Sequence, residues 1–238
     1  MLSKNQIKLI TSLKHKKFRQ EHGLFVAEGI KTIKEFLNAP FELVQLFTVK
    51  PFNIDAKFET LITDQELKKI SFLKSPNQAL ALFKIPNSHV IDFNNLVVVL
   101  DAVRDPGNLG TIIRLCDWFG IPDLICSETT VDAYNPKVIQ ATMGSLTRVN
   151  ITYLNLDAFL EKTSLPIFGA FMEGNNVYQE KLPKKGILVL GNEANGISKS
   201  IEEKINQRIA IPRFGTIQKT ESLNVATAAA ILISEFKR

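Results

Sequence analysis

Short apolar runs alternate with amphipathic segments of helical length from Leu96 to the end of the chain. Runs such as Val97–Leu100 and Ile187–Leu190 are continuously apolar, as in strands that are buried on both faces. The segment Leu109–Phe119 instead places Leu109, Ile112, Ile113 and Cys116 at the spacing of one helix face. This alternation predicts a mostly parallel sheet covered by helices. The elements expected in this part are Val97–Leu100, Leu109–Phe119, Asp123–Cys126, Pro136–Met143, Asn150–Leu154, Asp157–Lys162, Ile167–Phe171, Ile187–Leu190, Ser198–Ile205, Ile209–Ile211 and Ser222–Phe236.

A separate pattern occupies the first part of the chain and predicts a small α/β domain. It begins with a basic helix, and its last helix starts at Asp64. The other expected elements are strands at Leu24–Ala27, Leu43–Val49, Glu59–Thr63 and Gln78–Phe83, and a helix at Ile30–Leu37. The polar, proline-containing segment Ile85–Asn95 is typical of a connection. We therefore expect one domain at residues 1–88 and a second at residues 95–238.

Composition narrows the class of protein. With 238 residues, 45% hydrophobic and 22% charged, the chain can bury one full core and a smaller second one. The longest apolar runs have the length of strands, and the Lys-rich start contains no apolar signal stretch. We expect a cytoplasmic protein that does not associate with a membrane. Cys116 and Cys126 do not match a disulfide framework or a zinc motif, which favours buried thiols.

The positive charge is concentrated in the first domain. Residues 1–90 carry 14 basic and 8 acidic side chains, or +6, whereas residues 91–238 carry 15 and 16, or −1. Basic residues precede the first acidic residue, and four of them, Lys14, Lys16, Lys17 and Arg19, are candidates for RNA phosphate contacts. A solvated helix face is the alternative explanation of the same run.

Three polar turns in the second domain predict a single site. Asn108 and Arg114 follow the first expected strand, Glu193 follows the strand that ends at Leu190, and Asn224 precedes the last helix. Because parallel strands bring their carboxyl ends to one edge of a sheet, these turns should meet there. We expect Glu193 to anchor Asn108 or Arg114, and we expect Ser222 to cap the last helix.

The same turns exclude several kinds of chemistry. Gly107–Gly110 lacks the spacing of a dinucleotide-binding loop, which disfavours an oxidoreductase, and no phosphate loop of a kinase is present. All three histidines precede the second domain, so the site would lack a nucleophile–histidine pair. The carboxylates are not spaced as metal ligands, and we expect no metal. Two interpretations without function stay open: Arg114 as a surface partner of Asp117, and Glu193 as an exposed loop carboxylate.

These segments resemble the three ordered motifs of the SpoU (TrmH) family of RNA ribose 2'-O-methyltransferases, within the SPOUT superfamily. The first motif lies in Val98–Gly120, the second in Leu188–Ile197, and the third in Ile211–Arg213 with Ser222–Ala230. In addition, Phe25–Lys31 is similar to part of the substrate-binding domain that precedes the catalytic domain in many members.

The resemblance implies a fold, a cofactor and a set of roles. The fold would be a C-terminal α/β trefoil-knot methyltransferase domain preceded by a small α/β substrate-binding domain, although knots are rare. The cofactor would be S-adenosyl-L-methionine, bound at Leu190, Gly191, Ile211, Ser222 and Leu223. The catalytic residues would be Asn108, Arg114, Glu193 and Asn224. The protein would methylate a ribose 2'-hydroxyl, in rRNA in preference to tRNA, as a homodimer formed through the knot domain.

The chain departs from the family pattern in the loop at residues 213–221, which is longer than usual and makes cofactor contacts there harder to assign. Arg213 and Lys219 in this loop are further candidates for RNA contact, with a solvated loop as the alternative. An RNA-binding protein that keeps the fold without methylating RNA is the runner-up function, and retention of the four catalytic positions argues against it. The sequence does not identify the RNA, the methylated nucleotide or the proton acceptor.

Overall fold

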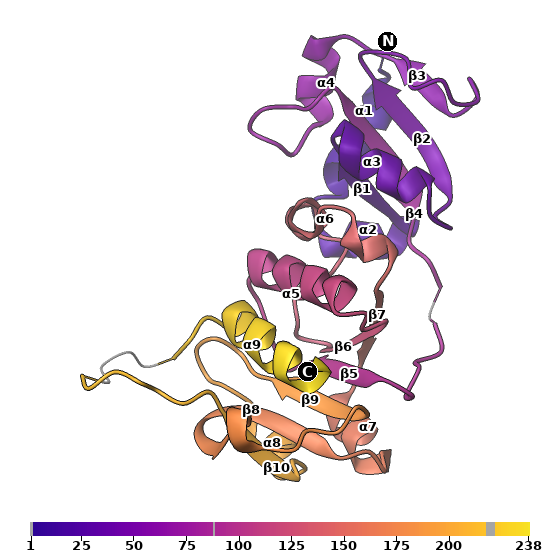
Figure 1. Cartoon of the computed structure of the whole chain (residues 1–238). Coiled ribbons are helices and arrows are strands. Elements are labelled where there is room, and N and C mark those ends of the chain that lie inside the picture. The colour runs from indigo at the N-terminus through magenta and orange to yellow at the C-terminus, as the bar shows by residue number, and fades with distance from the viewer. Residues whose placement is uncertain (1, 88, 218–221) are drawn as a thin grey trace. The chain divides into compact units, whose positions relative to one another are not determined.

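The computed structural model describes residues 2–87, 89–217 and 222–238, and the chain divides into two compact units (Figure 1). One unit contains Met1–Asn87 with Asp132–Thr147, and the other contains Ser88–Val131 with Arg148–Arg238. The sequence pattern assigned residues 132–147 to the second domain. Their contacts instead place them in the N-terminal unit.

The N-terminal unit is a four-stranded sheet with helices on both faces. The strand order is β1-β4-β2-β3, and only the β2–β3 pair is parallel. The elements are α1 (Lys4–Ser12), α2 (Lys16–His22), β1 (Leu24–Glu28), α3 (Ile30–Leu37), β2 (Leu43–Thr48), β3 (Glu59–Leu61), α4 (Asp64–Ile70), β4 (Ala79–Lys84), α6 (Pro136–Thr142) and the short helix η1 (Ser145–Thr147). The expected basic helix is thus two helices, α1 and α2.

Two apolar clusters hold this unit together. On one side of the sheet, Ile10 and Leu13 near α1 and Leu67 and Ile70 of α4 pack with strand residues such as Phe47. Around Phe25, a cluster of rings contains Phe36, Phe41, Phe83 and Tyr134, with ring centroids 4.9 to 5.9 Å from that of Phe25. Tyr134 therefore connects residues 132–147 to the core of the N-terminal unit.

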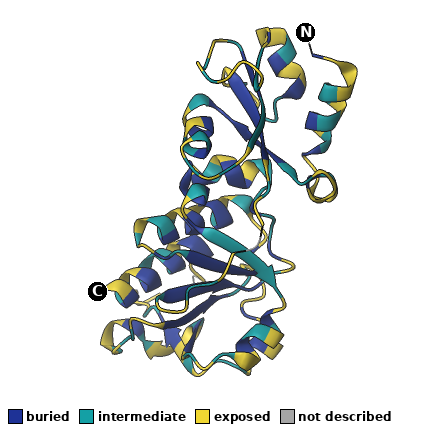
Figure 2. Ribbon diagram, turned by 90° about the vertical axis from the view of Figure 1, so that its right-hand side faces the viewer, coloured by how far each residue is buried: buried dark blue, intermediate teal, exposed yellow. Residues whose placement is uncertain are grey.

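The second unit is a six-stranded sheet in which every pairing is parallel, as the continuous apolar runs predicted. Its strand order is β10-β8-β9-β5-β6-β7. The elements are β5 (Leu96–Leu100), α5 (Pro106–Trp118), β6 (Asp123–Ser127), β7 (Asn150–Leu154), α7 (Leu156–Lys162), β8 (Ile167–Asn176), the short helix η2 (Val177–Gln179), β9 (Gly186–Leu190), α8 (Lys199–Glu202), β10 (Gln207–Ala210) and α9 (Val225–Lys237). Strands β5 and β9 are buried along their whole length (Figure 2).

Helices cover both faces of this sheet. Side chains such as Val97 and Val189 pack with Leu156 and Leu160 of α7 and Ile201 of α8. Helix α5 packs against α9, and the two lie on the opposite side of the sheet from α7 and α8 (Figure 1). From β5 the chain continues into β6 and β7 on one side of β5. Strands β9, β8 and β10 lie on its other side. The carboxyl ends of β5 and β9 therefore form a topological switch point, where ligands bind in open α/β sheets.

Candidate active site

The first two polar turns begin at the same level of the sheet. Leu100, the last residue of β5, pairs with Leu190, the last residue of β9. The backbone N–H of Asp101 then donates to the Leu190 carbonyl at 2.9 Å. Residues far apart in sequence thus enter one site, because the register of two neighbouring strands aligns their ends.

Three side chains from the three turns form a hydrogen-bonded chain at this edge. Asn108 Nδ2 donates to Glu193 Oε1 at 2.7 Å, and Asn224 Nδ2 donates to Asn108 Oδ1 at 2.9 Å. Each contact uses a different pair of turns, and all three side chains lie at solvent-accessible positions. The prediction that the turns converge is therefore confirmed, and Glu193 binds Asn108.

The first turn is held in an unusual backbone conformation. Ala102 has a φ of 57°, which non-glycine residues adopt at a cost of about 1–3 kcal/mol. Its N–H donates to Ser127 Oγ at 2.9 Å, and its carbonyl accepts from Asn192 Nδ2 at 2.6 Å. These two bonds offset the strain and direct the chain toward α5. Asp105 caps that helix by accepting from the N–H of Asn108, and Pro106 occupies the first helical position.

The second turn is a tight loop closed by backbone hydrogen bonds between Asn192 and Gly196, both at 2.9 Å. A Cβ on Gly191 would lie 2.2 Å from the carbonyl carbon of Gly196, so only glycine fits there. Asn192 also accepts the N–H groups of Ala194 and Asn195 through its side-chain oxygen. Asn192 thus joins the first two turns, a role that its position in a Gly-Asn turn did not reveal.

The third turn ends at Asn224, which caps α9. Its Oδ1 accepts from the N–H groups of Ala226 and Thr227, at 2.9 and 3.2 Å. The expectation that Ser222 is the cap was wrong, because the helix begins at Val225, three residues further on. Oδ1 accepts from the first turn of α9 and Nδ2 donates to Asn108, so the amide of Asn224 fixes the start of α9 relative to the site.

Arg114 is exposed on α5 and stands apart from this hydrogen-bonded chain. Its expected alternative partner, Asp117, binds Arg148 instead, with Arg148 Nε 3.0 Å from both carboxylate oxygens. Within residues 2–87, 89–217 and 222–238, the guanidinium of Arg114 has no hydrogen bond or ion pair. The interpretation as a surface pair with Asp117 is therefore excluded, and the charge of Arg114 is available to a ligand.

A cavity of about 710 Å³ lies next to the hydrogen-bonded chain. This volume is within the range of roughly 300–1,000 Å³ that is usual for small-molecule sites. Its lining contains every residue expected to bind the cofactor: Leu190, Gly191, Ile211, Ser222 and Leu223. Glu193 also lines it, and β8 contributes Ala170, Phe171 and Met172, which sequence reasoning missed because that strand carries none of the motifs.

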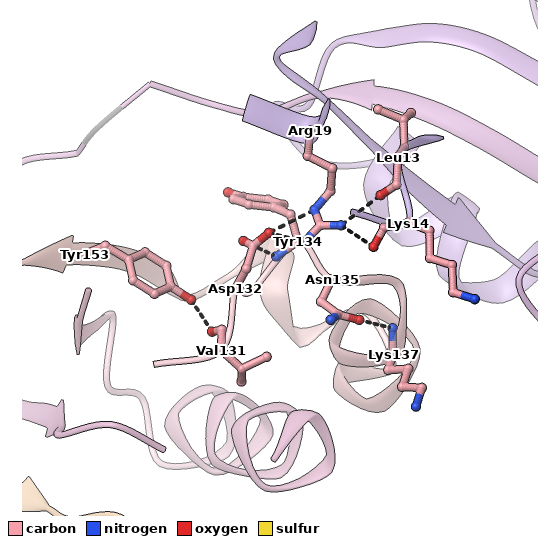
Figure 3. A network of polar contacts seen from close by, with 9 residues as sticks. All are labelled: Leu13, Lys14, Arg19, Val131, Asp132, Tyr134, Asn135, Lys137 and Tyr153. Carbon is pink, nitrogen blue, oxygen red and sulfur yellow. Dashed lines mark hydrogen bonds and ion pairs between the residues drawn. The ribbon is translucent and has the colours of Figure 1, made fainter. Parts of the chain in front are cut away.

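Of the four basic residues expected to contact RNA, three are exposed and one is not. Lys14, Lys16 and Lys17 lie at the surface of the turn between α1 and α2 and in the first turn of α2. Arg19 is only 1% exposed. Its Nε donates to Asp132 at 2.8 Å, and one terminal nitrogen donates to the carbonyls of Leu13 and Lys14 (Figure 3).

These contacts correct the expectation for Arg19. The second terminal nitrogen also binds Asp132, at 2.5 Å, so the guanidinium is occupied by the protein itself. Arg19 holds residues 132–147 to the turn after α1 and cannot reach a phosphate without breaking this pair. Lys219, the other loop candidate, lies outside the described residues.

The two cysteines are buried in the second unit. Burial raises the pKa of Cys116 to about 12 and raises the pKa of Cys126 as well, so both thiols stay protonated at neutral pH. Among the described residues, no three His, Cys, Asp or Glu side chains are grouped so that they would hold a metal ion. Nor does any described helix have the length and apolarity needed to cross a membrane.

Comparison with known proteins extends the match over nearly the whole chain. Residues 95–234 match the model of the SpoU rRNA Methylase family, and residues 4–81 match the MRM3-like substrate binding domain. A 23S rRNA (guanosine(2553)-2'-O)-methyltransferase of Bacillus subtilis is 29% identical over 97% of this chain and 96% of its own length.

Solved structures show the same similarity in three dimensions. A TrmH-family protein from Porphyromonas gingivalis is 36% identical, with a TM-score of 0.88 over 99% of this chain and 98% of its own. An AdoMet-bound rRNA methyltransferase from Sinorhizobium meliloti is 26% identical, with a TM-score of 0.89 over 100% of this chain and 95% of its own.

Proposed function

The chain belongs to the SpoU rRNA Methylase family, and we propose that its three converging turns orient an RNA ribose for methylation of the 2'-oxygen. The protein is an S-adenosylmethionine-dependent RNA 2'-O-ribose methyltransferase. The observation that carries this proposal is the hydrogen-bonded chain of Asn108, Glu193 and Asn224 at the rim of the 710 Å³ cavity.

The cavity fits the cofactor by its chemistry. Leu190, Ile211 and Leu223 provide apolar surface for a purine ring, and Ser222 adds a hydroxyl. The absence of a side chain at Gly191 lets its backbone lie against that of Gly196, and both residues line the cavity, where backbone N–H and C=O groups can recognise a ligand. When bound there, S-adenosylmethionine supplies an electrophilic methyl group on a sulfonium.

The roles of the protein's own residues follow from their contacts. Glu193 holds the Asn108 amide, Asn224 holds its oxygen, and together they provide a rigid polar edge for the ribose. Such positioning of the reacting atoms can account for roughly 7–11 kcal/mol of the barrier. Positioning is therefore the main contribution that we assign to these three residues.

Arg114 supplies positive charge and a planar set of donors. A guanidinium does not give up its proton in proteins, so we assign Arg114 to clamping an RNA phosphate and polarising the ribose hydroxyl. S-adenosylmethionine held in the cavity lined by Leu190, Ile211 and Leu223 would supply the methyl group to the ribose 2'-oxygen, leaving its sulfur as a neutral thioether. The hydroxyl proton passes to an acceptor that we do not assign.

Ribosomal RNA is the proposed substrate, in preference to transfer RNA. Support comes from the Bacillus subtilis relative, whose name assigns it to 23S rRNA and which this chain matches along almost its full length. The exposed Lys14, Lys16 and Lys17 of the N-terminal unit provide charge for the phosphates. A cytoplasmic location is part of the proposal, since the substrate would be found there.

We also propose that the active unit is a homodimer formed through the proposed knot domain. One face of α5 presents Thr111, Arg114 and Trp118 to solvent, and Trp118 is 84% exposed. So large an exposed ring suits an interface more than a free surface. Arg114 is not bound to the hydrogen-bonded chain of its own copy, so in a dimer its guanidinium can reach the active site of the second copy.

Mixing two inactive variants tests this arrangement. If Arg114 acts on the partner's site, Arg114→Ala mixed with Glu193→Ala should recover about one quarter of wild-type activity, because half of the dimers are mixed and each holds one intact site. If Arg114 serves its own copy, the mixture stays inactive. If light scattering showed a monomer and that monomer were fully active, the proposed dimer would be contradicted.

Methylation is tested by mapping ribose 2'-O-methyl marks in total RNA from cells with and without this protein. The loss of a single rRNA mark, restored by wild-type protein, would identify the substrate. A protein that only binds RNA would leave every mark in place. Such a protein would also give no heat with S-adenosylmethionine in calorimetry, whereas the enzyme should bind it in the cavity.

A further inference from the structure

A second and smaller cavity lies entirely within the N-terminal unit. Its volume is about 190 Å³, and it lies between β1, the residues after α4, and α6. Val26, Phe72, Leu73 and Pro136 make its apolar lining, while Lys137 and Gln140 stand exposed on α6 at its rim. No motif of the catalytic unit contributes to it.

One buried acid lines this cavity. Val26 and Glu28 alternate along β1 and so face the same side of the sheet. Glu28 is only 5% exposed. One carboxylate oxygen accepts from Ser71 Oγ at 2.5 Å, and the other accepts from the N–H of Phe72 at 2.7 Å.

These two bonds leave acceptor capacity on Glu28. A carboxylate has about four lone-pair sites, and the described residues use one on each oxygen. The bonds also fix the direction of the carboxylate, because Ser71 and Phe72 are consecutive residues and Phe72 lines the cavity. A ligand that reaches Glu28 therefore meets a fixed acceptor in otherwise apolar surroundings.

The dimensions and chemistry restrict the ligand to one small planar group, of the size of a nucleic-acid base. A volume of 190 Å³ equals that of about six liquid waters, at ~30 Å³ each, and is below the usual range for whole small-molecule ligands. Phe72 and Pro136 provide flat apolar surface, and Lys137 at the rim would repel a cation but attract a phosphate. Single-stranded RNA offers unstacked bases with this combination of features.

We propose that this cavity binds one unstacked RNA base that carries an exocyclic amino group, with Glu28 as the acceptor and Lys137 on the adjacent phosphate. Cytosine, adenine and guanine can donate an exocyclic amino group to Glu28. Uracil has no amino group, and its N3–H lies between two carbonyl oxygens that the carboxylate would repel. The N-terminal unit then recognises base identity in addition to charge. This inference rests on RNA being the substrate, as proposed above.

Binding of short RNAs to the full-length protein tests the proposal. Fluorescein-labelled hexanucleotides of cytidine, adenosine and uridine would be titrated by anisotropy at fixed salt without S-adenosylmethionine. We expect the wild type to bind the cytidine and adenosine oligomers at least about fivefold more tightly than the uridine oligomer, the lower end for one good base-edge contact. Equal affinities for all three would overturn the proposal.

Two variants separate recognition from folding. Gln140→Trp places a large ring at the mouth of the cavity without changing Glu28, and it should abolish the preference for cytidine over uridine. Gln65→Trp makes the same substitution on an exposed position of α4 outside the cavity, and it should keep the preference. A preference that survives Gln140→Trp would show that the base binds elsewhere and would overturn the proposal.

Glu28→Gln gives an independent test, because the amide presents donors as well as an acceptor. It should reduce or reverse the preference for cytidine over uridine, with circular dichroism confirming that the N-terminal unit remains folded. An unchanged preference in the folded variant would exclude Glu28 as the acceptor. Methyl transfer by each protein is measured in parallel, so that loss of the base preference is distinguished from failure of the proposed activity.

Discussion

Two arginines, one in each unit, have opposite environments. Arg19 is buried, and its guanidinium binds Asp132 and the carbonyls of Leu13 and Lys14. Arg114 is exposed, and within the described part of the chain its guanidinium binds nothing. The first arginine is therefore structural, and the second is available to a phosphate or a ribose.

This difference shows how far residue type alone can be trusted. Both arginines were candidate functional residues from the sequence, Arg19 for RNA contact by its place in a basic run and Arg114 for catalysis by its motif. Burial and pairing distinguish them, because Arg19 is enclosed and the protein already uses four of the five N–H donors of its guanidinium. Substitutions that separate effects on stability from effects on activity can test whether Arg19 and Arg114 differ in this way.

The largest effect is expected from Arg19→Ala. Removing one partner of a buried pair costs about 3–5 kcal/mol, because Asp132 is left with an uncompensated charge. Urea unfolding followed by circular dichroism measures the loss. The double variant Arg19→Met with Asp132→Asn removes both charges and should recover much of it, while the new amide oxygen can still accept from the N–H of Tyr134.

One outcome would contradict the structural role of Arg19. If Arg19→Ala left the free energy of unfolding unchanged but weakened RNA binding, the arginine would contact RNA after all. The salt bridge would then have to open when RNA binds.

Arg114→Ala should show the reverse pattern. We expect single-turnover methyl transfer to fall about 10²–10³-fold, as when one preorganised charge-stabilising group is removed. The free energy of unfolding should change by no more than about 0.5 kcal/mol, since the side chain is an exposed surface group. Arg114→Lys is the matched control: it keeps the charge but loses the planar donors, so an intermediate rate is expected. Wild-type activity in Arg114→Ala would remove this residue from the mechanism.

Replacing Lys14, Lys16 and Lys17 by alanine tests whether charge near Arg19 reaches RNA. If each lysine neutralises one phosphate, the slope of log affinity against log salt should become shallower by about 2–3. The matched control replaces the exposed Lys181, Lys184 and Lys199 of the other unit, which changes the net charge equally. Equal slopes in both triple variants would assign the N-terminal lysines to solvation alone.

Much of the fold could be predicted because local pattern determines where elements occur. The strand expected at Ile187–Leu190 is β9, Gly186–Leu190, since a continuous apolar run leaves few alternatives. Helix α5 begins three residues earlier than expected, at Pro106, because its start is set by the Asp105 cap and not by apolar spacing. Strand β8 extends to Asn176 because its polar end pairs with β10, in a register that shifts between Arg208 and Ile209.

The site was predictable to a similar degree. Parallel topology alone indicated that the three turns converge, and the family resemblance indicated which residues line the cavity. The pairing of Arg19 with Asp132, 113 positions away, left no trace in local pattern. The same is true of Asn192, whose bond to the Ala102 carbonyl depends on the alignment of β5 with β9. The knot implied by the resemblance remains a prediction.

The side chain of Asn224 has both a structural role and a positioning role, and two substitutions can separate them. Its oxygen caps α9, and its nitrogen donates to Asn108. Asn224→Ala loses both contacts and should destabilise the protein by about 1 kcal/mol. Asn224→Asp keeps an oxygen for the cap, so stability should stay near that of the wild type, but it can no longer donate to Asn108.

Methyl transfer should therefore fall in both Asn224 variants, whereas the urea midpoint should fall only with alanine. If the aspartate variant keeps full activity, the contact between Asn224 and Asn108 does not contribute to positioning, and Asn224 acts only as a helix cap. If both variants lose stability equally, the cap requires the amide itself. The first of these outcomes would place Asn224 with Arg19 as a structural residue, and would leave Asn108 and Glu193 as the positioning pair beside Arg114.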